Sequence, residues 1–211
     1  MKTNLPPLEK EPQRLGVLGG TFDPPHYGHL LMAEQSRLDF ELDQVFLVPA
    51  GIPPHKRGEQ SAPLSSARER YEMVILAASG SPFFQVWDFE LKKKGPSYTL
   101  ETLNALQKAL PRTRIFFIMG RDSLAEIFSW KNPREILTGY DIIVVSREGD
   151  PGSLIEEIEQ EIEGARIHRL LMPALNISST ELRERVRREK SLTFLLPSPV
   201  ENYIWKNGLY C

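Results

Sequence analysis

Cysteine is almost missing from this chain of 211 residues, and the only one, Cys211, is the last residue. A lone cysteine cannot form an intramolecular disulfide, nor can it belong to a metal site built from several cysteines. Disulfide-stabilised secreted folds and cysteine-rich zinc modules are therefore excluded. A reducing, cytoplasmic location is expected.

Long apolar runs are also missing. Runs such as Ile115 to Met119 and Ile142 to Val145 fall far short of the ~20 residues that cross a bilayer. The segment from Met1 to Arg14 contains no apolar run that could serve as a signal peptide. We expect no membrane association, a flexible leader over residues 1–13, and a single domain over residues 14–211. The apolar fraction of 41% suffices for a core.

The sequence has no excess of positive charge. Its formal net charge is −2 and its isoelectric point is near 6.1, which argues against a protein that coats nucleic acid. A local basic stretch from Arg183 to Lys190 contains interleaved glutamates. That pattern is typical of a solvated helix face.

Short apolar runs alternate with helical periodicity along the chain. The runs predict buried strands at Leu15–Leu18, Val45–Val48, Phe83–Trp87, Ile115–Met119, Ile142–Val145 and Ile167–Leu171. Helices are predicted at Tyr27–Phe40, Ala67–Ala78, Tyr98–Ala109, Leu154–Glu163, Ser179–Arg188 and Pro199–Asn207. Capping-box spacing occurs at Ser66/Glu69, Ser178/Glu181 and Ser198/Glu201.

This alternation predicts an α/β fold: a Rossmann-like, doubly wound parallel sheet with helices on both faces and a small C-terminal helical appendix. Ligands bind such sheets beyond the carboxyl ends of the strands. The turns at Gly19–His29, Pro49–Lys56 and Gly120–Asp122 all lie at such ends. We therefore expect the three turns to meet at one cleft.

The most informative stretch reads Gly-Gly-Thr-Phe-Asp-Pro-Pro-His-Tyr-Gly-His over residues 19–29. It joins a predicted strand to a predicted helix. Gly19 and Gly20 permit close approach of a ligand to the backbone, and the free amides of the helix start favour an anion. Because His26 and His29 are three residues apart, both imidazoles lie on one side of the helix start.

Two plainer readings of the histidines exist. They could be solvated side chains, or they could be two zinc ligands. Zinc would need further ligands, and only His55 and His168 remain, neither at a characteristic spacing. Together with the preceding glycine turn, the pair favours phosphate binding.

A second candidate anion site opens a late helix, at Ile177-Ser-Ser-Thr-Glu-Leu-Arg183. Ser178 could be an ordinary N-cap. Three successive hydroxyls, the helix-start amides and Arg183 one turn on are more than a cap requires. A triphosphate would suit this surface.

Weaker candidates lie in the other loops. Lys56, in a proline-rich loop, could neutralise a phosphate or could simply be exposed. Asp122 follows a buried strand and could accept hydrogen bonds from a ribose. Trp130 could pack in the core or stack on a heteroaromatic ring. No Ser-His-Asp order or paired carboxylates stand out, so catalysis would come from positioning and charge.

These motifs resemble the nucleotidylyltransferase superfamily, and more closely the bacterial nicotinate-nucleotide adenylyltransferases. The matching pieces follow family order at residues 19–29, 48–56, 97–103, 120–124, 130 and 177–183. The resemblance implies transfer of the adenylyl group of ATP to nicotinate mononucleotide, giving nicotinic acid adenine dinucleotide and pyrophosphate, without a covalent intermediate. It also implies Mg²⁺ held mainly by phosphates and water. Arg121 departs from the family, which usually has a small residue there.

The resemblance also implies roles for individual residues. His26, His29, Lys56 and Arg183 would be catalytic, and Lys56, Thr99 and Trp130 would bind the mononucleotide. ATP binding would fall to Gly19, Gly20, Thr21, Phe22, Gly28, Gly120, Asp122, Ile177, Ser178, Ser179 and Thr180. An adenylyltransferase for nicotinamide mononucleotide or phosphopantetheine is an alternative, as is a nucleotide sensor without activity. A class I aminoacyl-tRNA synthetase would be larger and would carry a Lys-Met-Ser-Lys-Ser loop, which is absent. The sequence leaves open whether the chain forms a homo-oligomer.

Overall fold

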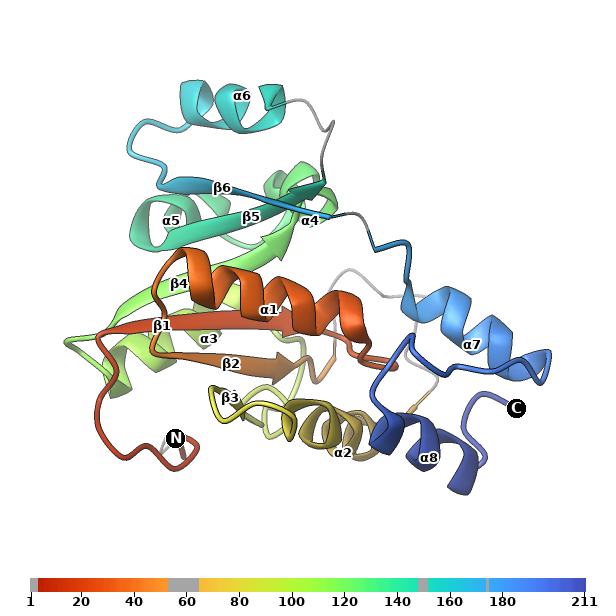
Figure 1. Ribbon diagram of the computed structural model, residues 1–211. Coiled ribbons are helices and arrows are strands. Elements are labelled where there is room, and N and C mark those ends of the chain that lie inside the picture. The colour runs from red at the N-terminus through yellow and green to blue at the C-terminus, as the bar shows by residue number, and fades with distance from the viewer. Residues whose placement is uncertain (1–3, 53–64, 148–151, 174) are drawn as a thin grey trace.

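The computed structural model describes residues 4–52, 65–147, 152–173 and 175–211. Its centre is a sheet of six strands, all paired in parallel, in the order β3-β2-β1-β4-β5-β6 (Figure 1). The strands are β1 (Arg14–Gly20), β2 (Gln44–Pro49), β3 (Phe84–Val86), β4 (Arg114–Gly120), β5 (Asp141–Arg147) and β6 (Ile167–Met172). The predicted doubly wound parallel sheet is confirmed.

The strand order reverses between β1 and β4. From β1 the chain runs outward through β2 to β3, then returns to β4 on the other side of β1 and continues outward to β6. In open parallel sheets a ligand crevice lies beyond the carboxyl ends of the strands at this switch point. Here that point is flanked by Gly20 and Gly120, which end β1 and β4.

Helices cover both faces of the sheet (Figure 1). They are α1 (Tyr27–Asp39), α2 (Ala67–Ala78), α3 (Thr99–Ala109), α4 (Arg121–Ala125), α5 (Pro133–Gly139), α6 (Ser153–Glu161), α7 (Ser179–Arg187) and α8 (Ser198–Lys206), with a 3₁₀ turn η1 (Ile127–Ser129). The short helices α4 and α5 and the turn η1 were not predicted, because segments of five and seven residues show too little periodicity.

Alternate strand residues face two separate cores. Val17 and Phe117 pack with Leu103 of α3 and with apolar residues of α5 and α6 on one face. Leu18 and Ile118 pack with Ala33 of α1 and Val74 of α2 on the other. Burial on both faces explains why the strands read as continuous apolar runs.

The helices of the predicted C-terminal appendix, α7 and α8, pack on α2 and form a third apolar core. Leu182 of α7 and Ile204 of α8 pack against Met73 of α2. Of the capping box predicted at Ser178, the serine half is confirmed, since Ser178 Oγ accepts the amide of Glu181, whereas the Glu181 carboxylate accepts from Arg185. The capping box predicted at Ser198 is wrong: Pro197 is the N-cap residue, and the Glu201 carboxylate accepts the amide of Leu192 instead.

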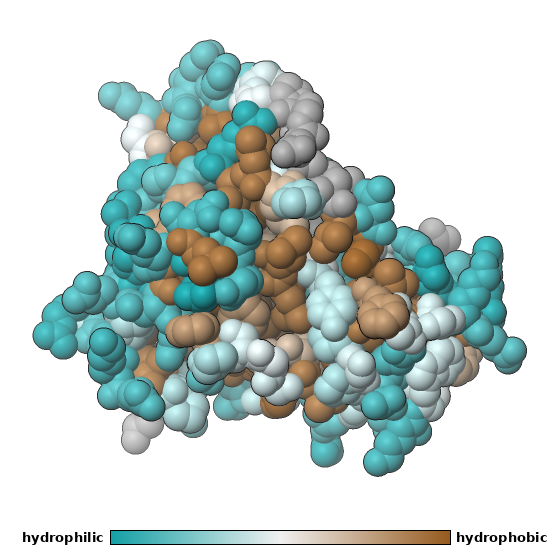
Figure 2. Space-filling model, viewed as in Figure 1, coloured by the Kyte–Doolittle hydropathy of each residue, from teal (hydrophilic) through white to brown (hydrophobic). Residues whose placement is uncertain are grey.

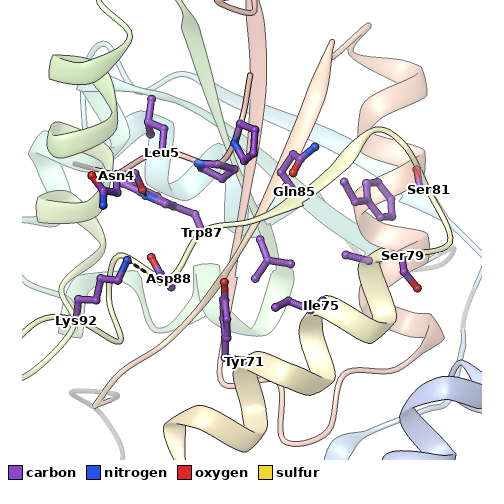
Figure 3. Close-up of a pocket in the computed structure, with 15 residues that line it drawn as sticks. Asn4, Leu5, Tyr71, Ile75, Ser79, Ser81, Gln85, Trp87, Asp88 and Lys92 are labelled. Carbon is purple, nitrogen blue, oxygen red and sulfur yellow. Dashed lines mark hydrogen bonds and ion pairs between the residues drawn. The ribbon is translucent and has the colours of Figure 1, made fainter. Parts of the chain in front are cut away.

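The described part of the leader contacts the rest of the chain. Trp87 Nε1 donates to the carbonyl of Asn4 at 3.0 Å, Thr113 Oγ1 donates to that of Pro12 at 2.6 Å, and Leu5 packs against the first core. Flexibility of the leader stays a prediction. Its residues form one wall of a 460 Å³ hollow beside α2 and β3, where Lys92 pairs with Asp88 (Figure 3). Of the predicted site residues that the structure describes, none lines this hollow.

Hydrophilic side chains cover much of the periphery of the face in Figure 2, including the far end of α7, and apolar side chains gather toward the middle. Ion pairs on α7 agree with the predicted solvated helix face, since Arg185 pairs with Glu181 and Arg188 with Glu184. Among the described residues, no helix has the length and apolar character needed to cross a membrane.

Candidate active site

The two histidines stand at the first turn of α1. His26 is the N-cap residue, and its backbone amide donates to Nδ1 of His29 at 3.2 Å. The two rings lie with their centroids 3.8 Å apart. The ring of Phe22 meets His29 edge-on from behind, at 4.9 Å. Both imidazoles are therefore held in fixed orientations beside the helix start, where the backbone amides favour an anion.

Gly28 leaves the space that the His26 ring occupies. A Cβ atom on Gly28 would lie 2.9 Å from both Cε1 and Nδ1 of that ring. Such a contact is shorter than van der Waals packing allows, so any larger residue would displace the imidazole. The glycine between the histidines is thus required by the packing of the pair.

Both imidazoles are kept neutral. Burial lowers the pKa of His26 to about 4. Burial and the neighbouring His26 lower the pKa of His29 well below its usual range. Nδ1 of His26 is buried and has no hydrogen-bond partner among the residues that the structure describes. In the neutral His29 ring, the nitrogen that accepts the amide is Nδ1, so Nε2 carries the proton and can donate to a phosphate oxygen.

The start of α7 is joined directly to the histidine loop. Ser179 Oγ donates to the carbonyl of Pro24, and Arg183 Nη1 donates to that of Asp23, both at 2.8 Å. Arg183 Nη2 also donates to Thr180 Oγ1. The two segments that the sequence singled out, 155 residues apart for the serine contact, therefore meet in space.

A first cavity, of 300 Å³, opens beside the histidines. His26, Gly28 and His29 line it together with Ile177, which precedes α7. Across from them it is lined by Gly120, Arg121 and Asp122, which follow β4. A Cβ atom on Gly120 would meet no atom within 4 Å, so the cavity reaches that backbone. Four of the predicted ATP-binding residues, from three loops, therefore line this cavity: Gly28, Gly120, Asp122 and Ile177.

A second cavity, of 260 Å³, lies on the other side of the end of β1. Its lining includes Gly19, Gly20 and Thr21 of the glycine turn, and Thr99 and Trp130 of the predicted mononucleotide set. Thr99 begins α3, so the amino end of an eleven-residue helix faces the cavity. The Trp130 ring is half-buried and meets Phe117 edge-on at 6.2 Å.

Several predicted residues lie elsewhere. Lys56 falls outside the described residues. The Phe22 side chain is buried behind His29 and lines neither cavity. Ser178, Ser179, Thr180 and Arg183 also line neither cavity, and their described contacts cap α7 or tie it to the histidine loop. Their predicted contact with phosphates stays a prediction.

The sequence analysis missed Arg70, which holds the backbone of the loops that follow β1 and β2. Its side chain is 1% exposed and donates to the carbonyls of Thr21, Ala50 and Gly51 at 2.6–3.1 Å. Burial lowers the pKa of this guanidinium, although the nearby Asp23 opposes the shift. Arg70 thereby joins the ends of β1 and β2. In the sequence it reads as one of many helix arginines, because its burial comes from long-range packing.

A second missed residue is Glu90, whose buried carboxyl lines the second cavity. It accepts a hydrogen bond from Thr102 Oγ1 at 2.6 Å. Burial raises the pKa of Glu90, while hydrogen bonds from Thr102 and Ser97 oppose this. Ser97 Oγ also accepts the amide of Gly51 at 3.1 Å, so these groups link α3 to the loop after β2. Nothing near Glu90 in the sequence marks it as buried.

No group of three His, Cys, Asp or Glu side chains that could hold a metal ion occurs within the parts of the chain that the structure describes. A cation can be held by the phosphates of a bound ligand. Magnesium commonly binds in this way, through substrate phosphates and water.

The sequence matches the profile of a known family and the sequences of known proteins. The profile of the cytidylyltransferase-like family matches residues 17–185. A probable nicotinate-nucleotide adenylyltransferase of Desulfitobacterium hafniense (strain DSM 10664 / DCB-2) is 42% identical over 206 residues, which cover 96% of this chain and 98% of that protein. One from Moorella thermoacetica is 41% identical over 207 residues, covering 96% and 94%.

The fold also matches a solved structure. That structure is Plasmodium falciparum nicotinic acid mononucleotide adenylyltransferase complexed with NaAD, with a TM-score of 0.73 and 20% identity over 94% of this chain and 97% of that one. At this level of identity the match supports the architecture. The sequence relatives carry the argument about family.

Proposed function

The chain belongs to the cytidylyltransferase-like family, and we propose that residues 14–211 form one domain that acts as a nicotinate-nucleotide adenylyltransferase. Its substrates are ATP and nicotinate mononucleotide, and its products are nicotinic acid adenine dinucleotide and pyrophosphate. The enzyme acts in the biosynthesis of NAD. The bacterial relatives, at 41–42% identity over nearly their whole length, support this activity.

One structural observation carries the proposal. Two cavities of 300 and 260 Å³ flank the segment from Gly19 to His29, which places a glycine turn and two imidazole donors between two nucleotide-sized spaces. A reaction that joins two nucleotides needs this arrangement. ATP would lie on the side of Gly120 and Asp122, and the mononucleotide on the side of Thr99 and Trp130.

The reaction is a direct displacement at phosphorus. An oxygen of the mononucleotide 5′-phosphate forms a bond to the α-phosphorus of ATP, and the bond from that phosphorus to the oxygen that bridges the α- and β-phosphates breaks in line with it, so that this oxygen leaves with pyrophosphate. Negative charge grows on the oxygens of the transferred group and of the leaving pyrophosphate. His26 and His29 would donate to these oxygens, joined by Arg183 and the hydroxyls of α7. Preorganised donors of this kind stabilise the transition state because they need no reorientation.

On the mononucleotide side, recognition would combine stacking with an anion site. Trp130 would stack on the pyridine ring. The amino end of α3, which begins at Thr99, would receive the carboxylate of nicotinate, because free amides and the helix dipole favour negative charge. This contact would favour nicotinate mononucleotide over nicotinamide mononucleotide as the substrate. Lys56 would neutralise the attacking phosphate or the α-phosphate.

We propose that Mg²⁺ enters with the triphosphate. When bound, it neutralises phosphate charge and lowers the barrier to attack. Nε2 of His29 would donate to a phosphate oxygen that the ion leaves free. We also propose that the enzyme works in the cytoplasm, as the single cysteine suggests.

The test is a coupled assay of pyrophosphate release with ATP and a panel of acceptors: nicotinate mononucleotide, nicotinamide mononucleotide and phosphopantetheine. We expect fastest turnover with nicotinate mononucleotide. Faster turnover with the amide or with phosphopantetheine would replace the substrate assignment. Release at the background rate with every acceptor, together with ATP binding, would indicate a sensor in place of an enzyme.

A further inference from the structure

The C-terminal tail of the chain reaches the loop that carries the histidines. Tyr210, the penultimate residue, has a positive φ of 67° and is buried in the third core. Its hydroxyl donates to Oδ1 of Asp23 at 2.7 Å, although the two residues are 187 positions apart. Asp23 is 3% exposed and lies three residues before His26. The Tyr210 side chain therefore reaches the loop that carries the histidines, and the C-terminus lies beside α7 and α8 (Figure 1).

Other elements hold the backbone of the same loop. Arg70 of α2 donates to the carbonyl of Thr21, Arg183 to that of Asp23, and Ser179 of α7 to that of Pro24. The tail contacts the side chain of Asp23 through the Tyr210 hydroxyl. The loop is thus fixed from α2, from α7 and from the tail, and the direction in which His26 leaves it depends on all three.

The chemistry of this contact makes it a strong constraint. Burial and the nearby Asp23 raise the pKa of Tyr210, so the hydroxyl stays protonated and donates. A hydrogen bond from a neutral hydroxyl to a carboxylate is charge-assisted and roughly twice as strong as a neutral one. Both residues are buried, which strengthens the bond relative to one exposed to solvent.

We propose that Tyr210 is a positioning residue for adenylyl transfer: its hydroxyl fixes Asp23, and through Asp23 the path of the chain into α1, so that His26 and His29 face the phosphates. The proposal rests on the proposed function for its kinetic consequence. Its structural consequence, the placement of the two rings, does not depend on turnover.

The test is Tyr210→Phe, which removes the hydroxyl and keeps the ring. The chain supplies a matched control in Tyr203→Phe, because Tyr203 on α8 also donates to a carboxylate, Glu72 Oε2, at 2.6 Å and away from the histidines. We expect kcat of Y210F to fall about tenfold, near the lower end of what a hydrogen bond to a charged group contributes. The KM for the mononucleotide stays within twofold, because the tail does not line that cavity. Y203F keeps kcat within twofold.

A second readout is the NMR spectrum of the histidine rings. Y210F should shift the signals of His26 and His29 and leave that of His168 in place, whereas Y203F should shift none. If Y210F is too unstable to assay, both variants and the wild type are compared in trimethylamine N-oxide, which favours the compact state. A folded Y210F with wild-type kcat and unmoved ring signals would overturn the proposal. Shifted ring signals in an enzyme without adenylyl transfer would support the positioning and refute the function.

Discussion

The backbone amide of His26 donates to the ring of His29 at 3.2 Å, so one catalytic candidate orients the other. Because Nδ1 of His29 accepts this bond, the proton of the neutral ring lies on Nε2. A donor therefore faces the cavity before any ligand arrives. The lowered pKa values of both rings keep this arrangement neutral near pH 7.

This relationship separates two functions of His29 by mutation. His29→Ala should lower kcat about 10²- to 10³-fold, as loss of a transition-state donor does, and should also lose the contact with the His26 amide. His29→Asn places an acceptor near the position of Nδ1 but no donor at that of Nε2. We expect H29N to match H29A in kcat and to unfold at a higher temperature, by calorimetry. An H29N enzyme with nearly wild-type kcat would contradict the assigned role.

Gly28→Ala tests the space that His26 needs. The new Cβ would meet the imidazole at 2.9 Å, and the ring can respond by rotating away. We expect kcat to fall roughly a hundredfold, the effect of about 1 Å of misplacement, with little change in melting temperature. Gly139→Ala is the control, since its Cβ would meet nothing within 4 Å. Equal activity of G28A and G139A would refute this account of the motif.

ATP binding should take up protons. Burial lowers the pKa of His26 to about 4 in the free protein, and a triphosphate beside the ring should raise it again. Calorimetry at pH 6.0 in two buffers of different ionisation enthalpy measures this uptake. We expect the wild type to take up more protons than His26→Gln, because only the wild type has the His26 ring. Subtracting the two values removes the contribution from protonation of the nucleotide itself. Equal uptake would show that the ring does not meet the phosphates.

Acid should destabilise the fold through the same histidines. In the unfolded chain they bind protons near pH 6.5, whereas in the folded chain the pKa of His26 is about 4. Between these values the unfolded state holds more protons, so the free energy of unfolding decreases as the pH falls from 6.5 toward 4. Urea titrations across this range should show a smaller decrease for His26→Gln than for the wild type.

Trp130→Ala should separate the two nucleotide sites. If Trp130 stacks on the pyridine ring, its removal raises the KM for nicotinate mononucleotide about three- to tenfold, the contribution of an aromatic pair beyond area burial. The KM for ATP should be unchanged, because Trp130 lines only the second of the two cavities. Trp130→Phe should recover most of the loss. A rise in the KM for ATP instead would mean that ATP binds in the second cavity and the mononucleotide in the first.

Asp141→Asn tests stability at the amino ends of the strands, opposite the ends that carry the candidate site. Asp141 is buried and accepts two hydrogen bonds from Arg114, at 2.6 and 2.9 Å, and contacts His168 at 2.8 Å. Burial raises the pKa of Asp141, but these hydrogen bonds outweigh it and leave the pKa lowered. The substitution should reduce the free energy of unfolding by about 1.5 kcal/mol at pH 7, because Arg114 is half exposed and solvent screens the pair. This loss should shrink as the pH falls below 4, and kcat should be unchanged.

Much of the fold could be predicted because its signals are local. Short apolar runs and helical periodicity reflect burial along neighbouring residues, and they placed the six strands and the longer helices. The glycine turn and the serine cap of α7 also depend on adjacent residues. The short helices α4 and α5 were not predicted, because five and seven residues are too few to show a helical period. The cap at Ser198 failed because a distant amide, that of Leu192, competes for Glu201.

The features of the candidate site likewise differ in whether they depend on neighbouring or on distant residues. By itself, the sequence determined which motifs carry the chemistry: the paired histidines, the hydroxyl-rich start of α7 and the loops that end the strands. Only the tertiary structure decided that two cavities flank the histidine loop, and that Arg70, Glu90 and Tyr210 are buried around it. The reason is physical. Whether a polar side chain is buried depends on partners far away in the chain, and those partners meet only when the sheet has formed.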